Sequence, residues 1–184
     1  FEHSLAIARE LDDHAMIATN CYQLGLLFQG QGDYNTAKKF YVDSLSARKS
    51  IGDQKGLGAT YHQLGIIYHV QGDYRTAQRL YDQSLVISNR LDDASGVAAS
   101  LGQLGSIAQE QGDYTRARKL YEASLDISKR LGNQAHTAAL HQNLGNLAFL
   151  QGDHESARSL YEDSLAIKEK IGDRSGLAST YHQM

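Results

Sequence analysis

The sequence of 184 residues contains no proline, no tryptophan and only one cysteine. The absence of proline removes the strongest helix breaker from the whole chain. The single cysteine, Cys21, excludes an internal disulfide, which fits a reducing compartment, and we predict a cytoplasmic location. No run of about 18 consecutive apolar residues occurs, so we predict no membrane-spanning segment and no membrane partner.

An excess of one charge sign is also missing. The formal net charge is −3, and no block of lysine or arginine runs through the chain. Nucleic-acid binding requires a concentrated basic surface, so we predict no nucleic-acid partner. The sequence also lacks a phosphate-binding loop, a nucleophile elbow and a dinucleotide-binding motif. We therefore predict no enzymatic activity, no catalytic residue and no cofactor.

What the sequence does contain is a repeat of fixed length. The string Gln-Gly-Asp-Tyr begins at Gln31, Gln71 and Gln111, and Gln-Gly-Asp-His begins at Gln151, each 40 residues after the last. No insertion or deletion interrupts this spacing. A constant period of this length indicates a stacked array of repeats.

Each period contains two turn signals, one at Gly32-Asp33 and one at Gly52-Asp53. Glycine can adopt the left-handed conformation that ends one helix, and aspartate can cap the next. Between the turns, apolar residues such as Tyr61, Leu64 and Tyr68 recur at helical spacing. We predict an all-α solenoid formed as a single domain, 1–184, that is a piece of a longer array. Its predicted parts are a partial second helix at 1–13, helix pairs at 14–52, 53–92, 93–132 and 133–172, and a partial first helix at 173–184.

A glycine occurs inside the first helix of every period, where it costs about 1 kcal/mol relative to alanine. These glycines are Gly25, Gly65, Gly105 and Gly145. Four glycines in register predict that the first and second helices of each pair cross with their backbones too close for a side chain.

These features together resemble the tetratricopeptide repeat family. The resemblance is carried by Leu64-Gly65, Tyr68, Gly72, Ala77, Tyr81, Ser84 and Leu85. The 40-residue period is similar to that of kinesin light chains, Pins/LGN adaptors and many bacterial signalling proteins. This resemblance implies a right-handed superhelix whose first helices line a concave groove that holds a peptide or a partner protein.

The sequence departs from the family pattern at the aromatic position that follows the helical glycine. Phe28 and Tyr68 occupy this position in the early repeats, and Ala108 and Ala148 occupy it in the later ones. We expect the later repeats to be packed more loosely or to be filled differently. The fold prediction is unchanged.

One position of the first helix carries an amide in every copy: Gln23, Gln63, Gln103, Asn143 and Gln183. A primary amide both donates and accepts hydrogen bonds, so a column of amides along a groove can pair with the backbone of an extended peptide. The resemblance implies the same role, because Pins-like adaptors and kinesin light chains carry a similar column. The alternative is that these amides only bridge neighbouring helices.

Neighbouring positions on the same helices vary, as residues that set specificity would. Leu26 and Ile66 predict an apolar anchor in the early repeats, and Gly102 predicts a dip in the groove floor. The predicted peptide-binding set adds the following residues to the amide column: Tyr22, His62, Gln142, Leu26, Ile66, Asn146 and His69.

Other residues are interpreted as structural. The spacing of His62 and His69 is too long for the helical i, i+4 zinc motif, so we predict no metal site. Cys21 is interpreted as a small core residue. Seven basic residues fall on second helices and are interpreted as a solvated face: Lys38, Lys39, Arg75, Arg79, Arg118, Lys119 and Arg158.

Two alternatives to peptide binding remain open. The array is a sensor or regulatory part of a larger bacterial signalling protein, or it self-associates head to tail. Self-association would use apolar surface that we expect to be exposed at the two ends, at Leu5, Ile7, Tyr181 and Met184.

Overall fold

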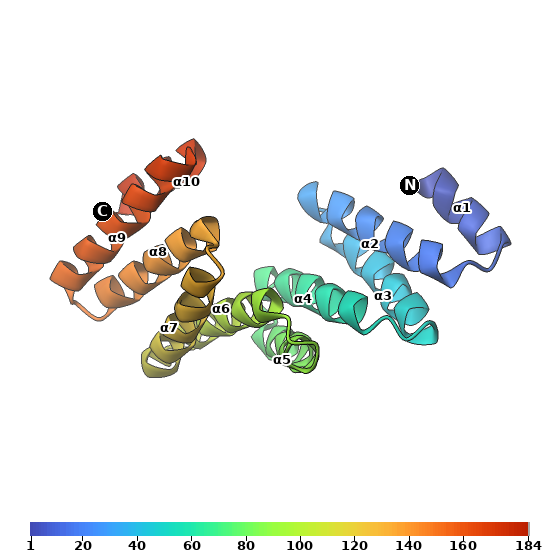
Figure 1. Ribbon diagram of the computed structural model, residues 1–184, viewed down its shortest axis with the longest axis horizontal. Helices are drawn as coiled ribbons and strands as arrows, with labels where there is room; N and C mark the ends of the chain where they lie inside the picture. The colour runs from blue at the N-terminus through green and yellow to red at the C-terminus, as the bar shows by residue number, and fades with distance from the viewer. Residues whose placement is uncertain (184) are drawn as a thin grey trace. The chain divides into compact units, whose positions relative to one another are not determined.

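The computed structural model describes residues 1–183 (Figure 1). This part of the chain contains ten α-helices and no β-strand. The predicted α-solenoid fold is therefore confirmed, with two helices in each 40-residue period. The helices are α1 (Glu2–Glu10), α2 (His14–Gly30), α3 (Tyr34–Ser50), α4 (Gln54–Val70), α5 (Tyr74–Arg90), α6 (Ala94–Glu110), α7 (Tyr114–Arg130), α8 (Gln134–Leu150), α9 (His154–Ile171) and α10 (Arg174–Gln183).

The helices divide between two compact units, Phe1–Gly96 and Val97–Met184. We call them unit 1 and unit 2. Unit 1 contains α1 to α5 and the first residues of α6, and unit 2 contains the rest of α6 and α7 to α10. The most extensive contacts join the helices of one repeat, as in α2 with α3, α4 with α5, and α8 with α9. The assignment of the whole chain to one domain and the right-handed superhelix stay predictions.

The turns have the predicted chemistry. Asp33 caps α3 by accepting a hydrogen bond from the backbone N–H of Thr36, and equivalent aspartates cap α5, α7 and α9. The preceding glycines have positive φ angles, for example +79° at Gly32. Asp12 and Asp92 replace glycine at two of the second turns and adopt φ angles of 53° and 52°.

The helical glycines lie against a tyrosine ring of the second helix. A Cβ atom on Gly25 would be 2.5 Å from Tyr41 Cε1, and one on Gly105 would be 2.7 Å from Tyr121 Cδ1. Gly65 and Gly145 face Tyr81 and Tyr161 in the same way. The prediction of a close approach is confirmed, but its stated reason is incomplete. The buried ring is the nearest obstacle at all four glycines, and the facing backbone is close at Gly145, where the Ala157 carbonyl would lie 3.3 Å from the Cβ atom.

Hydrogen bonds fix the register of three helix pairs at the same positions. The buried Ser44 hydroxyl donates to the Ala18 carbonyl at 2.8 Å, and Ser124 and Ser164 donate to Ala98 and Ala138 in the same way.

The glutamine of the Gln-Gly-Asp motif joins one repeat to the next. Gln71 Oε1 accepts a hydrogen bond from Lys38 Nζ at 3.2 Å, and Gln151 Oε1 accepts one from Arg118 at 2.8 Å.

The alanine substitutions in the later repeats are accommodated by a different set of side chains. In unit 1, the Phe28 ring stacks on Phe40 with 5.5 Å between the centroids. In unit 2, Ala108 is 1% exposed and lies in a cluster of Tyr121 and leucine side chains. The position is therefore filled differently, which is one of the two outcomes that the sequence predicted.

Candidate functional site

The predicted peptide-binding residues lie on the first helix of each repeat. We call this surface the first-helix face. In unit 1 it belongs to α2 and α4, and in unit 2 to α6, α8 and α10. Eleven of the twelve predicted side chains are half-buried and one, Gln183, is exposed. Half-buried groups are reachable by a ligand and are also held by their neighbours, so their individual contacts matter.

In unit 1, the amide column is tied to the core by a chain of hydrogen bonds. The Tyr41 hydroxyl donates to Gln29 Oε1 at 2.8 Å, and Gln29 Nε2 donates to Gln63 Oε1 at 3.3 Å. Gln29 lies on α2 and Gln63 on α4, so this amide pair links neighbouring first helices. Gln23 makes no side-chain hydrogen bond to any residue within 1–183.

In unit 2, a similar link joins α8 and α10. Gln142 Nε2 donates to Gln183 Oε1 at 2.6 Å, and Gln142 Oε1 accepts a hydrogen bond from Thr180 at 3.2 Å and another from Lys168 Nζ. At both Gln63 and Gln183 the carbonyl oxygen of the column amide is held by the preceding first helix. Its NH₂ group makes no hydrogen bond within the described residues. At these two positions the side-chain amide can therefore link two first helices and still donate a hydrogen bond to a ligand.

Two cations from second helices reach the first-helix face, and the sequence analysis missed both. The Arg48 guanidinium lies over the Tyr22 ring, 5.1 Å from its centroid, and pairs with Asp53 at 2.8 Å. Lys168 is 5% exposed and donates to Gln142 and to Thr180. Burial lowers the pKa of the Lys168 ammonium, and the charge of the nearby Asp173 carboxylate partly opposes that effect.

A comparison of equivalent positions in the repeats could have revealed these cations, because one position is basic in two copies. The position reads Ala8, Arg48, Ser88, Ser128 and Lys168 in successive copies. Arg48 lies over Tyr22 and Lys168 donates to Gln142, and these two contacted residues occupy equivalent repeat positions. The first-helix face therefore carries positive charge from second helices.

The apolar residues of the face lie in unit 1. Tyr22 and Leu26 pack against the cluster that contains Tyr41, and the Tyr22 and Tyr41 ring centroids are 5.8 Å apart. The His62 ring lies 5.4 Å from that of Tyr81, and the His69 ring lies 5.6 Å from that of Tyr74. Ile66 is half-buried beside them on α4.

The polar residues of unit 2 are placed differently from one another. Asn146 Oδ1 accepts a hydrogen bond from Tyr161 at 2.7 Å, whereas Asn143 makes no side-chain hydrogen bond within residues 1–183. The dip expected at Gly102 is filled, because His136 Nε2 would lie 3.4 Å from a Cβ atom there. Burial lowers the pKa of His136, so its ring is neutral at pH 7 and its Nδ1 pairs with Ser128 Oγ at 2.9 Å.

The described residues offer little support for a reactive cysteine, a metal site or a membrane-spanning helix. Cys21 is fully buried, and burial together with the Asp43 charge raises the pKa of its thiol to about 11, so it is not an activated nucleophile. Within residues 1–183, no group of three His, Cys, Asp or Glu side chains could hold a metal ion. No helix of this part is long and apolar enough to cross a bilayer.

The expected apolar surface at the chain ends is only partly present. Leu5 is 5% exposed because it packs against Cys21 and Leu24 of α2, so its predicted exposure is wrong. Ile7 and Tyr181 are 41% and 59% exposed. Met184 lies outside the described residues.

Comparison with known proteins places this architecture in a family. A family model described as a tetratricopeptide repeat matches residues 20–90, 56–130 and 96–170. The chain belongs to the tetratricopeptide repeat family. Its repeats form a scaffold of the kind that mediates protein–protein interaction. No protein of curated function matches the sequence.

Two solved structures are similar to this tetratricopeptide repeat chain. The crystal structure of BtubC (BKLC) from P. vanneervenii matches with a TM-score of 0.80 and 24% identity, over 98% of this chain and 80% of that one. The apo form of RapI matches with a TM-score of 0.76 and 16% identity, over 97% of this chain and 51% of that one. At these identities the likeness establishes the fold alone.

Proposed function

We propose that the protein holds an extended segment of a partner protein against its first-helix face, within a concave groove. Family membership supports the general role of an interaction scaffold. The observation that carries the finer proposal is the state of the amide column. At Gln63 and Gln183 the preceding first helix holds the carbonyl oxygen, and the NH₂ group makes no hydrogen bond within residues 1–183.

An NH₂ group fixed in this way is a donor for a peptide carbonyl. An extended chain has no internal hydrogen bonds, so its carbonyl groups are available along its whole length. Ordering these donors before the ligand arrives also lowers the entropy lost on binding. Amides that contact the backbone recognise an extended shape and do not select the ligand's side chains.

Selectivity is assigned to unit 1, where Tyr22, Leu26 and Ile66 supply half-buried apolar surface. One apolar ligand side chain packed on these residues would anchor the segment. No catalytic step, metal or cofactor enters this proposal.

The test uses peptides selected on the full chain from a random phage-displayed library. The selected peptide is titrated by calorimetry into the wild type and into the double variant Leu26→Asp/Ile66→Asp. We expect at least a tenfold loss of affinity, because a carboxylate would be desolvated against the ligand's apolar side chain.

The matched control is Val42→Asp/Val86→Asp, which makes equivalent changes on second helices of unit 1 where both valines are 56% exposed. This control is expected to bind as the wild type does. Circular dichroism checks that both variants fold. Equal affinity of the two double variants would refute the assignment of the first-helix face.

The amide column is tested separately with Gln63→Leu, which keeps the bulk and removes the NH₂ donor. We expect a three- to tenfold loss with every selected peptide, whatever its sequence. A loss limited to peptides with one particular side chain would contradict backbone recognition.

The sensor role and head-to-tail self-association stay predictions. The exposed Tyr181 ring favours the second of these. Light scattering over a range of protein concentrations, with Tyr181→Glu as the variant, distinguishes a self-associating chain from a monomer.

A further inference from the structure

Both units contain a pocket at the same repeat position, away from the predicted binding residues. Each is lined by the end of one second helix, the start of the next first helix and the end of the second helix that follows. In unit 1 the pocket has a volume of about 290 Å³ and is lined by Arg9, His14, Ile17, Asp43, Ser46, Ala47 and Ser50. In unit 2 it has a volume of about 400 Å³ and is lined by Lys129, Gly132, Gln134, Thr137, Ala166, Ile167 and Lys170.

The unit 2 pocket is positively charged. Lys129 and Lys170 line it from the last turns of α7 and α9, and none of its described lining residues is acidic. In the unit 1 pocket, by contrast, Arg9 is paired with Asp43 at 3.1 Å. The same fold position is therefore neutralised in one unit and cationic in the other.

The hydroxyl of Thr137 also lines the unit 2 pocket. Thr137 is 6% exposed as a whole, and its hydroxyl makes no hydrogen bond within residues 1–183. The buried Thr60 hydroxyl instead donates to the Gly56 carbonyl at 2.9 Å. The Thr137 oxygen is not one of the buried polar atoms that lack a partner, so it reaches the solvent of the pocket and is available to a ligand there. The equivalent residue in unit 1 is Ile17, which needs no partner.

The remaining wall of the unit 2 pocket is apolar. Ala166 and Ile167 form it, and the methylene chains of the two lysines extend it. The pocket therefore combines an apolar surface with the side-chain hydrogen-bond donors of Lys129, Lys170, Thr137 and Gln134, two of them charged.

We propose that this pocket binds a small organic phosphate. Its apolar body would lie on Ala166 and Ile167, and its phosphoryl oxygens would accept hydrogen bonds from Lys129, Lys170 and the Thr137 hydroxyl. The site is separate from the first-helix face and does not depend on the function proposed for that face.

The probe is phenyl phosphate, titrated into the ¹⁵N-labelled full chain and followed by the shifts of the backbone amide signals. Saturable shifts are expected in the segments 129–137 and 166–170. Inorganic phosphate should bind the same segments at least tenfold more weakly, since it buries no apolar surface. Phenol, which lacks the phosphate, should cause no saturable shift there. If phenol bound with the same affinity as phenyl phosphate, the pocket would not be an anion site. If inorganic phosphate bound with the same affinity as phenyl phosphate, the ligand would not need an organic body.

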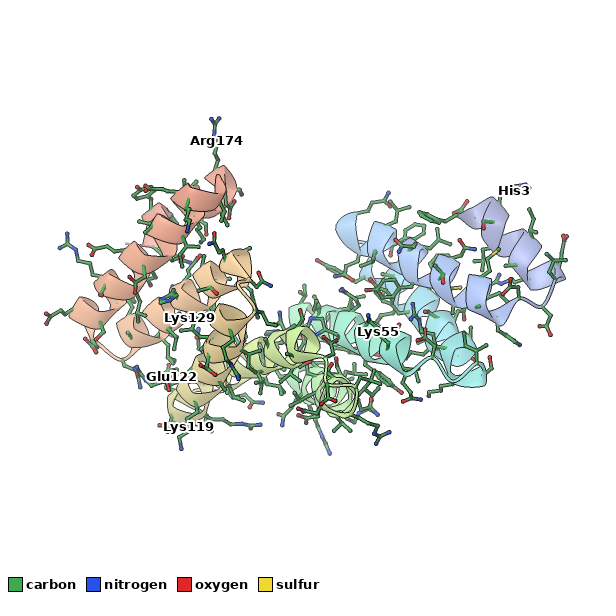
Figure 2. The ribbon with its side chains drawn as sticks, viewed as in Figure 1. His3, Lys55, Lys119, Glu122, Lys129 and Arg174 are labelled. Atoms are coloured by element: carbon green, nitrogen blue, oxygen red, sulfur yellow. The ribbon has the colours of Figure 1, made fainter. Side chains whose placement is uncertain are left out.

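The variant Lys129→Gln/Lys170→Gln is expected to lose at least tenfold in affinity for phenyl phosphate. Its matched control is Arg116→Gln/Lys119→Gln, which removes the same charge from exposed positions near the other end of α7. Figure 2 labels Lys119 in the first half of this helix and Lys129 in its last turn. An equal loss in both variants would show general charge attraction and would overturn the proposal.

Two further tests use the Thr137 hydroxyl and the unit 1 pocket. Thr137→Val preserves the shape of the side chain and should lower affinity about tenfold, because a hydrogen bond to a charged group is lost. Signals of residues 9–17 and 43–50 should not shift, since the unit 1 pocket is neutralised. An unchanged affinity in Thr137→Val, or equal binding at the unit 1 pocket, would refute the proposed site.

Discussion

Units 1 and 2 share one internal framework and differ on two surfaces. In both, a second-helix tyrosine fills the space beside a first-helix glycine, and a buried serine donates to the facing helix. The first-helix face is apolar and aromatic at Tyr22 and Leu26 of unit 1, and polar at Gln142 and Asn143 of unit 2. The unit 1 pocket holds an ion pair, and the unit 2 pocket holds two lysines that form no ion pair within residues 1–183. The repeated residues thus maintain the fold, and the varied residues give each unit a different surface chemistry.

The largest expected effect tests whether the framework contributes equally to the two units. Tyr41 and Tyr121 are 0% and 1% exposed. Replacing either by alanine should lower the free energy of unfolding by about 3–5 kcal/mol, because each change opens a cavity beside a helical glycine. Urea unfolding of Tyr41→Ala and Tyr121→Ala measures this. A loss below about 1 kcal/mol in one unit only would show that the two frameworks are not equivalent.

A smaller effect is expected when the glycine side of the same contact is changed. Gly25→Ala and Gly105→Ala place a Cβ atom within 2.5 and 2.7 Å of a tyrosine ring. We expect each to cost about 1–3 kcal/mol through overpacking.

Gly30→Ala is the control for these substitutions, since no atom lies within 4 Å of its Cβ position and the residue ends α2. This variant should be as stable as the wild type or slightly more so, because alanine restricts the unfolded chain. Destabilisation of Gly30→Ala by as much as Gly25→Ala would mean that helix propensity, and not the ring contact, explains the glycines.

The smallest effect concerns pH and is expected in both units. Hydrogen bonds from Thr36 and Ser156 lower the pKa values of the capping residues Asp33 and Asp153. A depressed carboxyl pKa contributes stability that is complete above the ordinary value near 3.8 and is lost as pH falls through the lowered value.

Thermal unfolding between pH 7 and pH 2 checks this effect with Asp33→Asn and Asp153→Asn. Each variant should lose less stability than the wild type as the solution is acidified. Parallel pH profiles for the wild type and both variants would contradict the assigned role of the caps.

The fold could be predicted from the sequence because the residues that end and cap each helix act locally. Gly32-Asp33 and its equivalents end one helix and cap the next, which needs no knowledge of the distant chain. The reason for Gly25 was harder to predict. The pattern of one helix shows that space is needed, but only the packed pair shows that the Tyr41 ring takes it.

The candidate site was less predictable, since its contacts join different helices. Arg48 and Lys168 belong to second helices, yet their long side chains reach Tyr22 and Gln142 on first helices. Leu5 was expected to be exposed because it lies near the end of the array, but it packs against Cys21 and Leu24 of α2. The pairing of Gln29 with Gln63 depends on the approach of two first helices, which helical periodicity does not describe.

The position of a bound segment on the protein tests the central proposal most directly. A phage-selected peptide carrying a nitroxide label would be bound to the ¹⁵N-labelled full chain, and the paramagnetic broadening of its amide signals would be measured. The proposal predicts broadening at residues 22–26 of α2 and 62–66 of α4, with the signals of Val42 and Val86 unaffected. Broadening centred on Val42 and Val86 of the second helices would contradict it.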